Sequence, residues 1–393
     1  MFDQPMTVKL FLDRILNGAA IGIVVGLIPN AITGELFKFL ARLMPSIELF
    51  TTLHQVVVGI QFTVPVIVGI LIGMQFGMSA VQTVIIGTAS FVGSGAMKFD
   101  ANGVMLVGIG DLINTMLTAS VAVLVLAWVG NKLGSLTVLF LPIIGGGVSG
   151  LVGILTLPYV SYITQAVGSA VNAIAASHGL GVFASVLIAV IFAIMIVSPI
   201  STVGVALAIG INGAASGAAN LGIAAAAAVL MVGSFRVNNA GVTWSVFLGA
   251  MKMMMGNLFK NPIMILPLSL VAAVTGLLGA FFGITGTPAS AGFGHSGLVG
   301  PIAAAAGMQG NTAVIIGTLA LVYLVVPIGL AIALHWLLAV KLHVYSPQIY
   351  AFTPQGAPVT KGAADKDLHA DASATDSDSD IPAENDTHLE EAR

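Results

Sequence analysis

Four long intervals of this chain contain no Asp, Glu, Lys or Arg, and they constrain the fold more than any other feature. They are residues 49–97, 112–131, 133–235 and 261–340. A helix needs about 20 consecutive apolar residues to cross a hydrocarbon core of about 30 Å, so these intervals predict about eight to ten membrane-embedded segments. With 57% hydrophobic residues, 7% charged residues and a mean hydropathy of +1.04, the chain is not a soluble globular domain. It is predicted to be a polytopic integral membrane protein.

The apolar runs also indicate the fold class. Inside a bilayer every backbone polar group must be satisfied within helices or within a closed barrel. A barrel would consist of strands of about 10 residues with alternating hydrophobicity, and this chain has long unbroken apolar runs instead. We therefore predict an all-α fold, with one span bent at Pro65. The similarity between residues 141–153 and 266–279 leaves an inverted repeat open.

Charge divides the chain into two parts. Residues 1–350 hold ten Lys or Arg and six Asp or Glu, whereas residues 351–393 hold three and ten. The second part has few apolar residues and cannot bury enough surface to fold. We predict a membrane domain over 1–350 and a disordered acidic tail over 351–393. Scattered basic residues, Lys9 and Arg14 among them, favour a cytoplasmic location for both ends.

Two segments are expected to lie outside the regular spans. Residues 159–179 carry Ser, Thr, Gln and Asn among small residues, which favours an amphipathic helix over a spanning one. Residues 234–262 contain three of the few cations, which places them at or beyond a membrane surface. The methionines at 251 and 253–255 are interpreted as packing residues.

No motif for catalysis is found in the chain. There is no HExxH, GxxxxGK[ST] or CxxC pattern, and the absence of cysteine excludes a thiolate site or phosphocysteine. We expect no catalytic residue, no cofactor and no metal site. Polar groups at membrane depth are then the informative residues, because burying one without a partner costs several kcal/mol.

Asp111 is the first candidate substrate-binding residue, with Asn114 one turn further along the same predicted helix. The carboxylate could bind an ion, a proton or a solute hydroxyl. It could equally lie at the headgroup level near Asp100. No acidic residue follows until Asp365, so a relay of carboxylates through the second half is excluded.

A break in the helical pattern at Ser198–Pro199–Ile200–Ser201 is the second candidate. Pro199 frees backbone carbonyls, and the hydroxyls of Ser198 and Ser201 lie beside them, as in discontinuous transporter helices that bind ions or ligands. A simple proline kink satisfied by neighbouring helices is the alternative.

The third candidate is the glycine-rich run 286–301. Gly286, Gly292, Gly294 and Gly297, together with Pro288, forbid a continuous helix. An uncharged, small-residue segment between two apolar spans favours a re-entrant hairpin over a surface loop. Ser290, His295 and Ser296 would then line a substrate cavity, unless His295 simply bonds the backbone.

This run, the KNP at 260–262 ahead of an apolar span, and the glycine-broken first half resemble a bacterial membrane family. It is the EIIC-like family of the phosphotransferase system, in the branch labelled predicted membrane proteins or putative toxin regulators. The resemblance covers residues of about 10–345. It implies a sugar permease subunit in the bacterial cell membrane, dimeric, with an elevator-type mechanism and separate EIIA and EIIB phosphocarrier partners.

One departure from the family bears on the site. Glucose-type and fructose-type EIIC domains hold the sugar with a glutamate in a short glycine-containing loop, and this chain has no glutamate between Glu48 and Glu384. The solute would be held by Asp111, by Asn, Ser, Thr or His side chains, or by the main chain. An ion-coupled secondary transporter without phosphorylation and a membrane sensor are therefore kept as alternatives.

Overall fold

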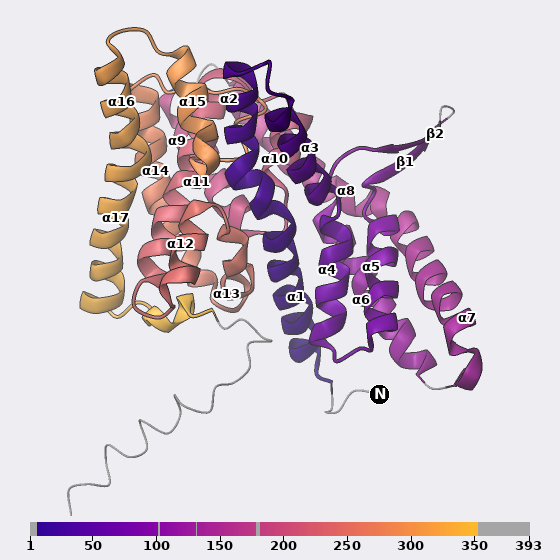
Figure 1. The fold of residues 1–393 in the computed structure, drawn as a ribbon. Helices are drawn as coiled ribbons and strands as arrows, with labels where there is room; N and C mark the ends of the chain where they lie inside the picture. Colours follow the sequence, from indigo (N-terminus) through magenta and orange to yellow (C-terminus); the bar gives the residue numbers. More distant parts are fainter. Residues whose placement is uncertain (1–5, 101–102, 131, 178–180, 353–393) are drawn as a thin grey trace, which may run out of the picture. The chain divides into compact units, whose positions relative to one another are not determined.

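The computed structural model describes residues 6–100, 103–130, 132–177 and 181–352. Figure 1 shows that these residues are almost entirely helical, which confirms the all-α class. Two short strands form the exception: β1 (Met97–Asp100) pairs antiparallel with β2 (Gly103–Leu106), Met97 opposite Leu106. The predicted tail lies outside the described residues from position 353 onward.

Within the described part of the chain, six helical stretches are long and apolar enough to cross a membrane. They are Val8–Pro29, Leu112–Val129, Leu139–Ala176, Gly213–Ser234, Pro262–Phe281 and Thr312–Lys341. A seventh forms if α3 (Glu48–Phe62) and α4 (Val64–Gln75) are one bent span. Their axes differ by 46°, and Pro65 is the second residue of α4, so the predicted bend is confirmed. The count of eight to ten embedded segments stays a prediction.

The first half of the chain builds one apolar core mainly from four helices. Buried Ile15, Ile23, Ile72, Ile86 and Leu126 belong to it. The helices are α1 (Val8–Pro29), α4, α5 (Ala80–Gly93) and α6 (Leu112–Val129), and α8 (Ser149–Ala176) packs against α5 and α6. Shorter helical pieces connect them: η1 (Asn30–Gly34), α2 (Glu35–Leu43), η2 (Gly134–Leu136), α7 (Thr137–Leu141) and η3 (Pro142–Val148).

Close backbone contact between α1 and α4 explains why these two helices pack so extensively. Gly18, Gly22 and Gly26 recur every four residues on one face of α1, against α4. A Cβ atom at Gly22 would lie 2.6 Å from the Cα of Val68, so only glycine permits this approach. Small residues at such spacing bring membrane helices together by close packing.

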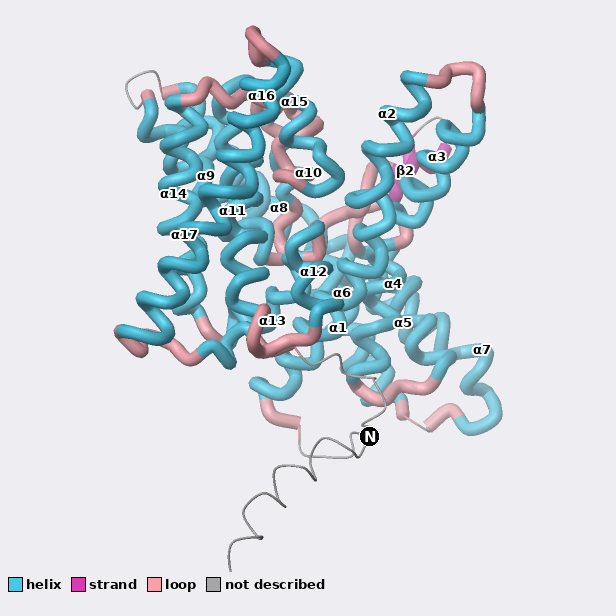
Figure 2. Tube along the Cα trace, turned by 60° about the vertical axis from the view of Figure 1, so that its left-hand side comes forward, coloured by secondary structure: helices cyan, strands magenta, loops and turns pink. Residues whose placement is uncertain are grey.

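The second half builds a separate core around α11 (Gly213–Ser234), whose alanines are almost all buried. Three helices pack around it, as Figure 2 shows: α9 (Val182–Val197), α14 (Ile265–Phe281) and α17 (Val326–His335). The remaining pieces are α10 (Thr202–Ala208), α12 (Ala240–Leu248), η4 (Met251–Met254), α13 (Met255–Lys260), η5 (Pro262–Met264), η6 (Ser296–Leu298), α15 (Val299–Gly307), α16 (Thr312–Ala320), η7 (Leu321–Val325), η8 (Trp336–Lys341) and η9 (Pro347–Tyr350).

The last described residues are clamped onto this second core by two asparagine side chains. Asn238 donates to the carbonyl of Tyr350 at 2.7 Å and accepts from the backbone N–H of Phe352 at 2.7 Å. Asn257 donates to the carbonyls of Ile349 and Ala351. The Tyr350 ring is fully buried. The chain therefore stays packed as far as residue 352.

One expectation about a span is wrong. Residues 159–176 do not form a separate amphipathic helix, because α8 runs without interruption from Ser149 to Ala176 with Pro158 inside it. The polar residues of this stretch have a different use, since Thr164 bonds Asp111 across the interior. The inverted repeat stays a prediction.

Candidate functional site

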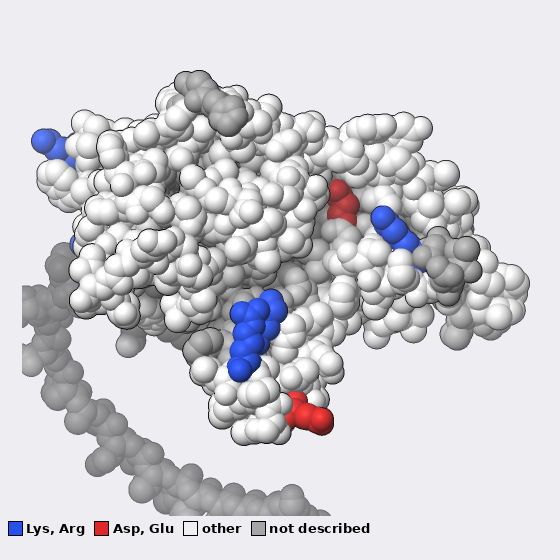
Figure 3. Space-filling model, turned by 90° about the horizontal axis from the view of Figure 1, so that it is seen from above, with Lys and Arg blue, Asp and Glu red and all other residues white. Residues whose placement is uncertain are grey.

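A cavity of about 610 Å³ with several polar side chains lies between α3, the start of α6, α8 and the break between α9 and α10. We call it the large cavity. Its polar side chains are Gln61, Ser94, Lys98, Asp111, Ser161, Thr164, Gln165 and Ser201. Figure 3 shows that the surface seen from above carries very few charged side chains. The cavity wall is mostly apolar, and its polar groups are neutral hydroxyls and amides together with the Asp111 carboxylate and the Lys98 ammonium.

Asp111 is half-buried at the wall of the large cavity and caps α6. Its Oδ1 accepts from the backbone N–H of Asn114 at 2.9 Å, as an N-cap residue does. Its Oδ2 accepts from the Thr164 hydroxyl at 3.1 Å. A carboxylate has about four acceptor positions, so Asp111 retains capacity to accept from a solute hydroxyl.

Asn114 is fully buried behind Asp111 and holds three helices together. Its Nδ2 donates to the carbonyls of Gly93 on α5 (2.6 Å) and Gly153 on α8 (2.8 Å). Its Oδ1 accepts from the Thr156 hydroxyl at 2.9 Å. Both amide protons are used, so Asn114 has none left to donate to a solute. It lines neither of the cavities described here.

The break at Ser198–Ser201 is a true interruption, since α9 ends at Val197 and α10 begins at Thr202. Pro199 is buried between them, and Ser201 caps α10 by accepting from the backbone N–H of Gly204. The Ser198 hydroxyl donates to the carbonyl of Met195. The carbonyls freed by the break accept from the Lys252 ammonium, through the oxygens of Ser198 and of Ile200, the latter at 2.9 Å.

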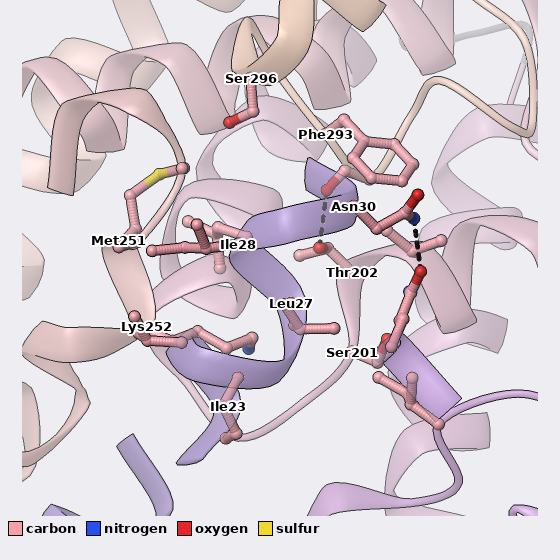
Figure 4. Close-up of a pocket in the computed structure, with 18 of the residues that line it drawn as sticks. Ile23, Leu27, Ile28, Asn30, Ser201, Thr202, Met251, Lys252, Phe293 and Ser296 are labelled. Carbon is pink, nitrogen blue, oxygen red and sulfur yellow. Dashed lines mark hydrogen bonds between the residues drawn. The ribbon is translucent and has the colours of Figure 1, made fainter. Parts of the chain in front are cut away.

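A second, smaller cavity of about 70 Å³ adjoins the large one, and we call it the small cavity. Gln61, Ile109, Leu112, Ser201 and Val203 line both. Lys252 and Ser296 line the small cavity, and in Figure 4 they lie on either side of Ile28, another lining residue, while Asn30 after the end of α1 bonds Gln61. Asn30 begins the π-helical turn η1, directly after Pro29, whose missing N–H disturbs the regular ladder.

The glycine-rich segment 282–295 forms turns and no helix, as its composition predicts. Its backbone groups are satisfied from two neighbouring helices. Thr202 donates to the carbonyl of Gly292 at 2.9 Å, Ser216 donates to that of Thr287, and Asn220 accepts from the N–H of Gly294 at 3.1 Å. Gly286 exchanges two backbone hydrogen bonds with Gly213. Whether the segment enters a membrane as a re-entrant hairpin stays a prediction.

The predicted ligands in this segment divide into two groups. Ser290 is buried and accepts from the Asn220 amide and from the backbone N–H of Thr287, and it lines neither cavity. His295 bonds the Phe247 carbonyl through Nε2 at 2.7 Å, while its buried Nδ1 has no partner among the described residues. Gly292, Phe293 and Ser296 do line the small cavity.

We call residues 286–297 the hairpin, after its predicted form. Two of its glycines adopt backbone conformations that favour glycine. Gly294 has φ +64° and Gly297 has φ +58°. A Cβ at Gly294 would also lie 2.5 Å from the Ile223 side chain on α11. The hairpin therefore packs directly onto α11.

Sequence reasoning missed three residues of this region: Lys252, Asn220 and Thr164. Lys252 was expected with its segment near a membrane surface, but its side chain is buried inside the protein. A lone lysine among methionines in an uncharged neighbourhood was the signal for it. Asn220 and Thr164 lie in apolar or small-residue runs, and only the folded contacts distinguish them from other polar residues there.

The helices that are long and apolar enough to cross a membrane agree with the family comparison. The family model described as "Phosphotransferase system, EIIC" matches residues 13–352, and the chain therefore belongs to this family. It is a multi-pass membrane protein and a permease subunit of the phosphotransferase system. Comparison with curated proteins and with solved structures found no match.

Proposed function

We propose that this permease subunit translocates a sugar bound in the large cavity. The observation that carries the proposal is the lining of that cavity: hydroxyl and amide side chains share its wall with the Asp111 carboxylate, the Lys98 ammonium and apolar side chains. Such groups exchange hydrogen bonds with a polyhydroxylated solute, in which each hydroxyl both donates and accepts. A volume of about 610 Å³ falls within the range of about 300–1,000 Å³ that is typical of small-molecule sites.

Asp111 takes the role that a glutamate has in other EIIC domains. It accepts from a solute hydroxyl, and Thr164 and the cap of α6 hold its carboxylate in place. Ser201 contacts the solute from the other side, because it lines both cavities at the helix break. Asn114, Ser290 and His295 act behind the cavity wall in this proposal, as residues that position the backbone.

An elevator-type movement is proposed for translocation. Two apolar clusters support it, one mainly from α1, α4, α5 and α6 and one mainly from α9, α11, α14 and α17, which we treat as two bodies. They meet where Met255 of α13 joins the first cluster and Val171 of α8 joins the second. The small cavity takes lining residues from both, Ile23 and Leu112 from the first and Ile196 and Met251 from the second. An ion pair between Asp13 on α1 and Lys260 on α13 (3.4 Å) also joins the two bodies.

Transport by purified protein in proteoliposomes tests the function. We expect uptake of a labelled hexose only when EIIA, EIIB and phosphoenolpyruvate-driven phosphorylation are supplied. Uptake driven by a Na⁺ or H⁺ gradient alone would favour the secondary transporter. Binding without any uptake would favour the sensor.

Cysteine labelling locates the bound solute, because the chain has no native cysteine. Thr164→Cys in the large cavity should react with a maleimide, and the transported hexose should slow that reaction. Val314→Cys, on an exposed part of α16, is the matched control and should show no protection. Equal rates with and without the hexose at Thr164→Cys would contradict the proposed site.

The elevator is tested by joining the two bodies. In a variant with Asp13→Cys and Lys260→Cys, a bifunctional maleimide should stop uptake and leave hexose binding intact. Unchanged uptake after complete cross-linking would exclude movement between α1 and α13. We further propose a homodimer in a bacterial cell membrane with both chain ends in the cytoplasm, which native mass spectrometry and protease protection of the tail would test.

A further inference from the structure

Lys252 is a buried cation without an acidic partner among the described residues. Its side chain is 6% exposed, and it bonds two backbone carbonyls at the helix break. The residues that line the small cavity beside it include no Asp or Glu. In the sequence no acidic residue lies between Asp111 and Asp365, so the second half offers no counter-charge before the tail.

Such an arrangement is costly unless something balances the charge. Removing an ammonium from water costs several kcal/mol, and neutral carbonyls return only part of it. The carbonyls of Ser198 and Ile200 take two of the three ammonium protons, which leaves one donor. Lys252 lines the small cavity, so this donor is available to whatever occupies that space.

Two further donors line the same cavity. Ser201 accepts from the N–H of Gly204 and keeps its own proton to donate. The Ser296 hydroxyl has no hydrogen-bond partner among the described residues, although this side chain is only 4% exposed. A cation and two hydroxyls thus line one cavity of about 70 Å³, which has room for a group of a few heavy atoms.

We infer that the small cavity binds a carboxylate of the solute, and that the substrate class is a sugar acid. The inference rests on the proposed function, since the hydroxylated part of the same solute occupies the adjoining large cavity. A carboxylate accepts only, which matches three spare donors, and it neutralises Lys252. In this inference the buried Asn30 Oδ1, which has no partner among the described residues, accepts from a hydroxyl of the solute.

Calorimetric titration of the detergent-solubilised full chain with D-glucuronate, D-gluconate, D-glucose and acetate tests the inference. We expect one of the two acids to bind at least about tenfold more tightly than D-glucose, which corresponds to one charged hydrogen bond. Lys252→Gln should remove this preference, and Lys252→Arg, which keeps charge and donors, should retain most of it. Melting temperatures of both variants check that they fold.

A second measurement needs no ligand. Ser296→Cys should react faster with an anionic methanethiosulfonate than with a cationic one, because Lys252 attracts the anion. Adding Lys252→Gln should abolish the difference. Ser161→Cys is the matched control, since Ser161 lines the large cavity and not the small one, and its rates should not respond to Lys252→Gln.

Each alternative outcome is decisive. Equal binding of D-glucose by the wild type and Lys252→Gln, with no preference for acids, would overturn the inference and leave the proposed function standing. Acetate binding as tight as that of the sugar acids would show a general anion site, and would also overturn it. If no sugar bound and none protected Thr164→Cys, the proposed function would fail together with the inference.

Discussion

Two buried asparagines support the two sides of the candidate site, and they do so differently. Asn114 joins three regular helices, because its amide bonds carbonyls of α5 and α8 and receives the Thr156 hydroxyl. Asn220 instead holds non-helical backbone, bonding the N–H of Gly294 and the hydroxyl of Ser290. We therefore expect the helices around Asn114 to stay rigid. The side around Asn220 depends on a few contacts to an irregular segment.

Both sides contain unpartnered groups. Near the hairpin, His295 Nδ1 is buried without a partner among the described residues, and on the other side the Ser90 hydroxyl of α5 and the Ser149 hydroxyl of α8 are buried without one. The contrast therefore lies in the backbone that each asparagine holds, regular helices at Asn114 and non-helical turns at Asn220. We expect the helical side to stay fixed and the irregular side to respond to the solute.

Gly292→Val should have the largest effect and should act on the hairpin alone. A Cβ at Gly292 would lie 2.4 Å from the Cα of Val203, so the hairpin must move away from α10 and the small cavity must change. Overpacking against backbone costs about 3 kcal/mol, and we expect loss of measurable sugar binding. Gly317→Val, at a glycine with open space around it, is the control and should bind normally. Calorimetry measures both.

Asn114→Leu should destabilise the helical frame by about 3 kcal/mol, because it removes the amide donor from the carbonyls of Gly93 and Gly153 and the acceptor of the Thr156 hydroxyl. The measurement is the unfolding free energy in detergent. The surviving folded protein should bind sugar with wild-type affinity, since Asn114 lines neither cavity. Weaker binding at full stability would reverse the roles given to the two sides.

Asn220→Leu should cost less stability, about 2 kcal/mol for two lost hydrogen bonds. Its effect on binding should exceed that of Asn114→Leu, because the hairpin carries Ser296 and Phe293 into the small cavity. The ratio of binding loss to stability loss in the two variants measures the contrast between the sides. Equal ratios of binding loss to stability loss in the two variants would contradict the contrast.

Asp111→Asn should weaken sugar binding about tenfold, or about 1.4 kcal/mol, with little loss of stability. Asparagine is as good an N-cap as aspartate, so α6 keeps its start and only the charge is lost. Calorimetric titration with D-glucose and with the sugar acid that the wild type prefers measures the change. Wild-type affinity would place the carboxylate outside the site.

Ser290→Ala should have the smallest effect, about 1 kcal/mol of stability for one neutral hydroxyl. Its hydroxyl bonds Thr287, Asn220 and, at 3.5 Å, the Ser216 hydroxyl. A melting-temperature shift larger than that of Asn220→Leu would mean that Ser290, and not Asn220, organises the hairpin.

Much of the fold follows from composition and spacing. Long uncharged intervals predict the spans, Pro65 predicts a bend, and glycines with Pro288 predict irregular backbone in the hairpin, because these properties are local. The expectation of a separate helix after residue 158 was wrong, since α8 is continuous and its polar residues Ser161, Thr164 and Gln165 line the large cavity, where Thr164 bonds Asp111.

The site was less predictable because it depends on contacts between distant segments. Asp111 and Ser201 could be selected as polar groups in apolar surroundings, and both line the large cavity. Lys252 donates to the carbonyls of Ser198 and Ile200, which lie 52 to 54 residues before it in the chain. This contact depends on the packing of η4 against α9. No periodicity or motif in the sequence predicts this long-range contact.

The clamp on residues 349–352 has a consequence for biosynthesis. Asn238 and Asn257 leave the ribosome roughly a hundred residues before the segment that they bind, and domains fold in the order of their synthesis. Until Tyr350 emerges, the surface around Gly233 that its ring covers stays open. A prematurely terminated chain would keep these asparagine amides unpaired, and membrane quality control could tell it from a finished one by that exposed patch.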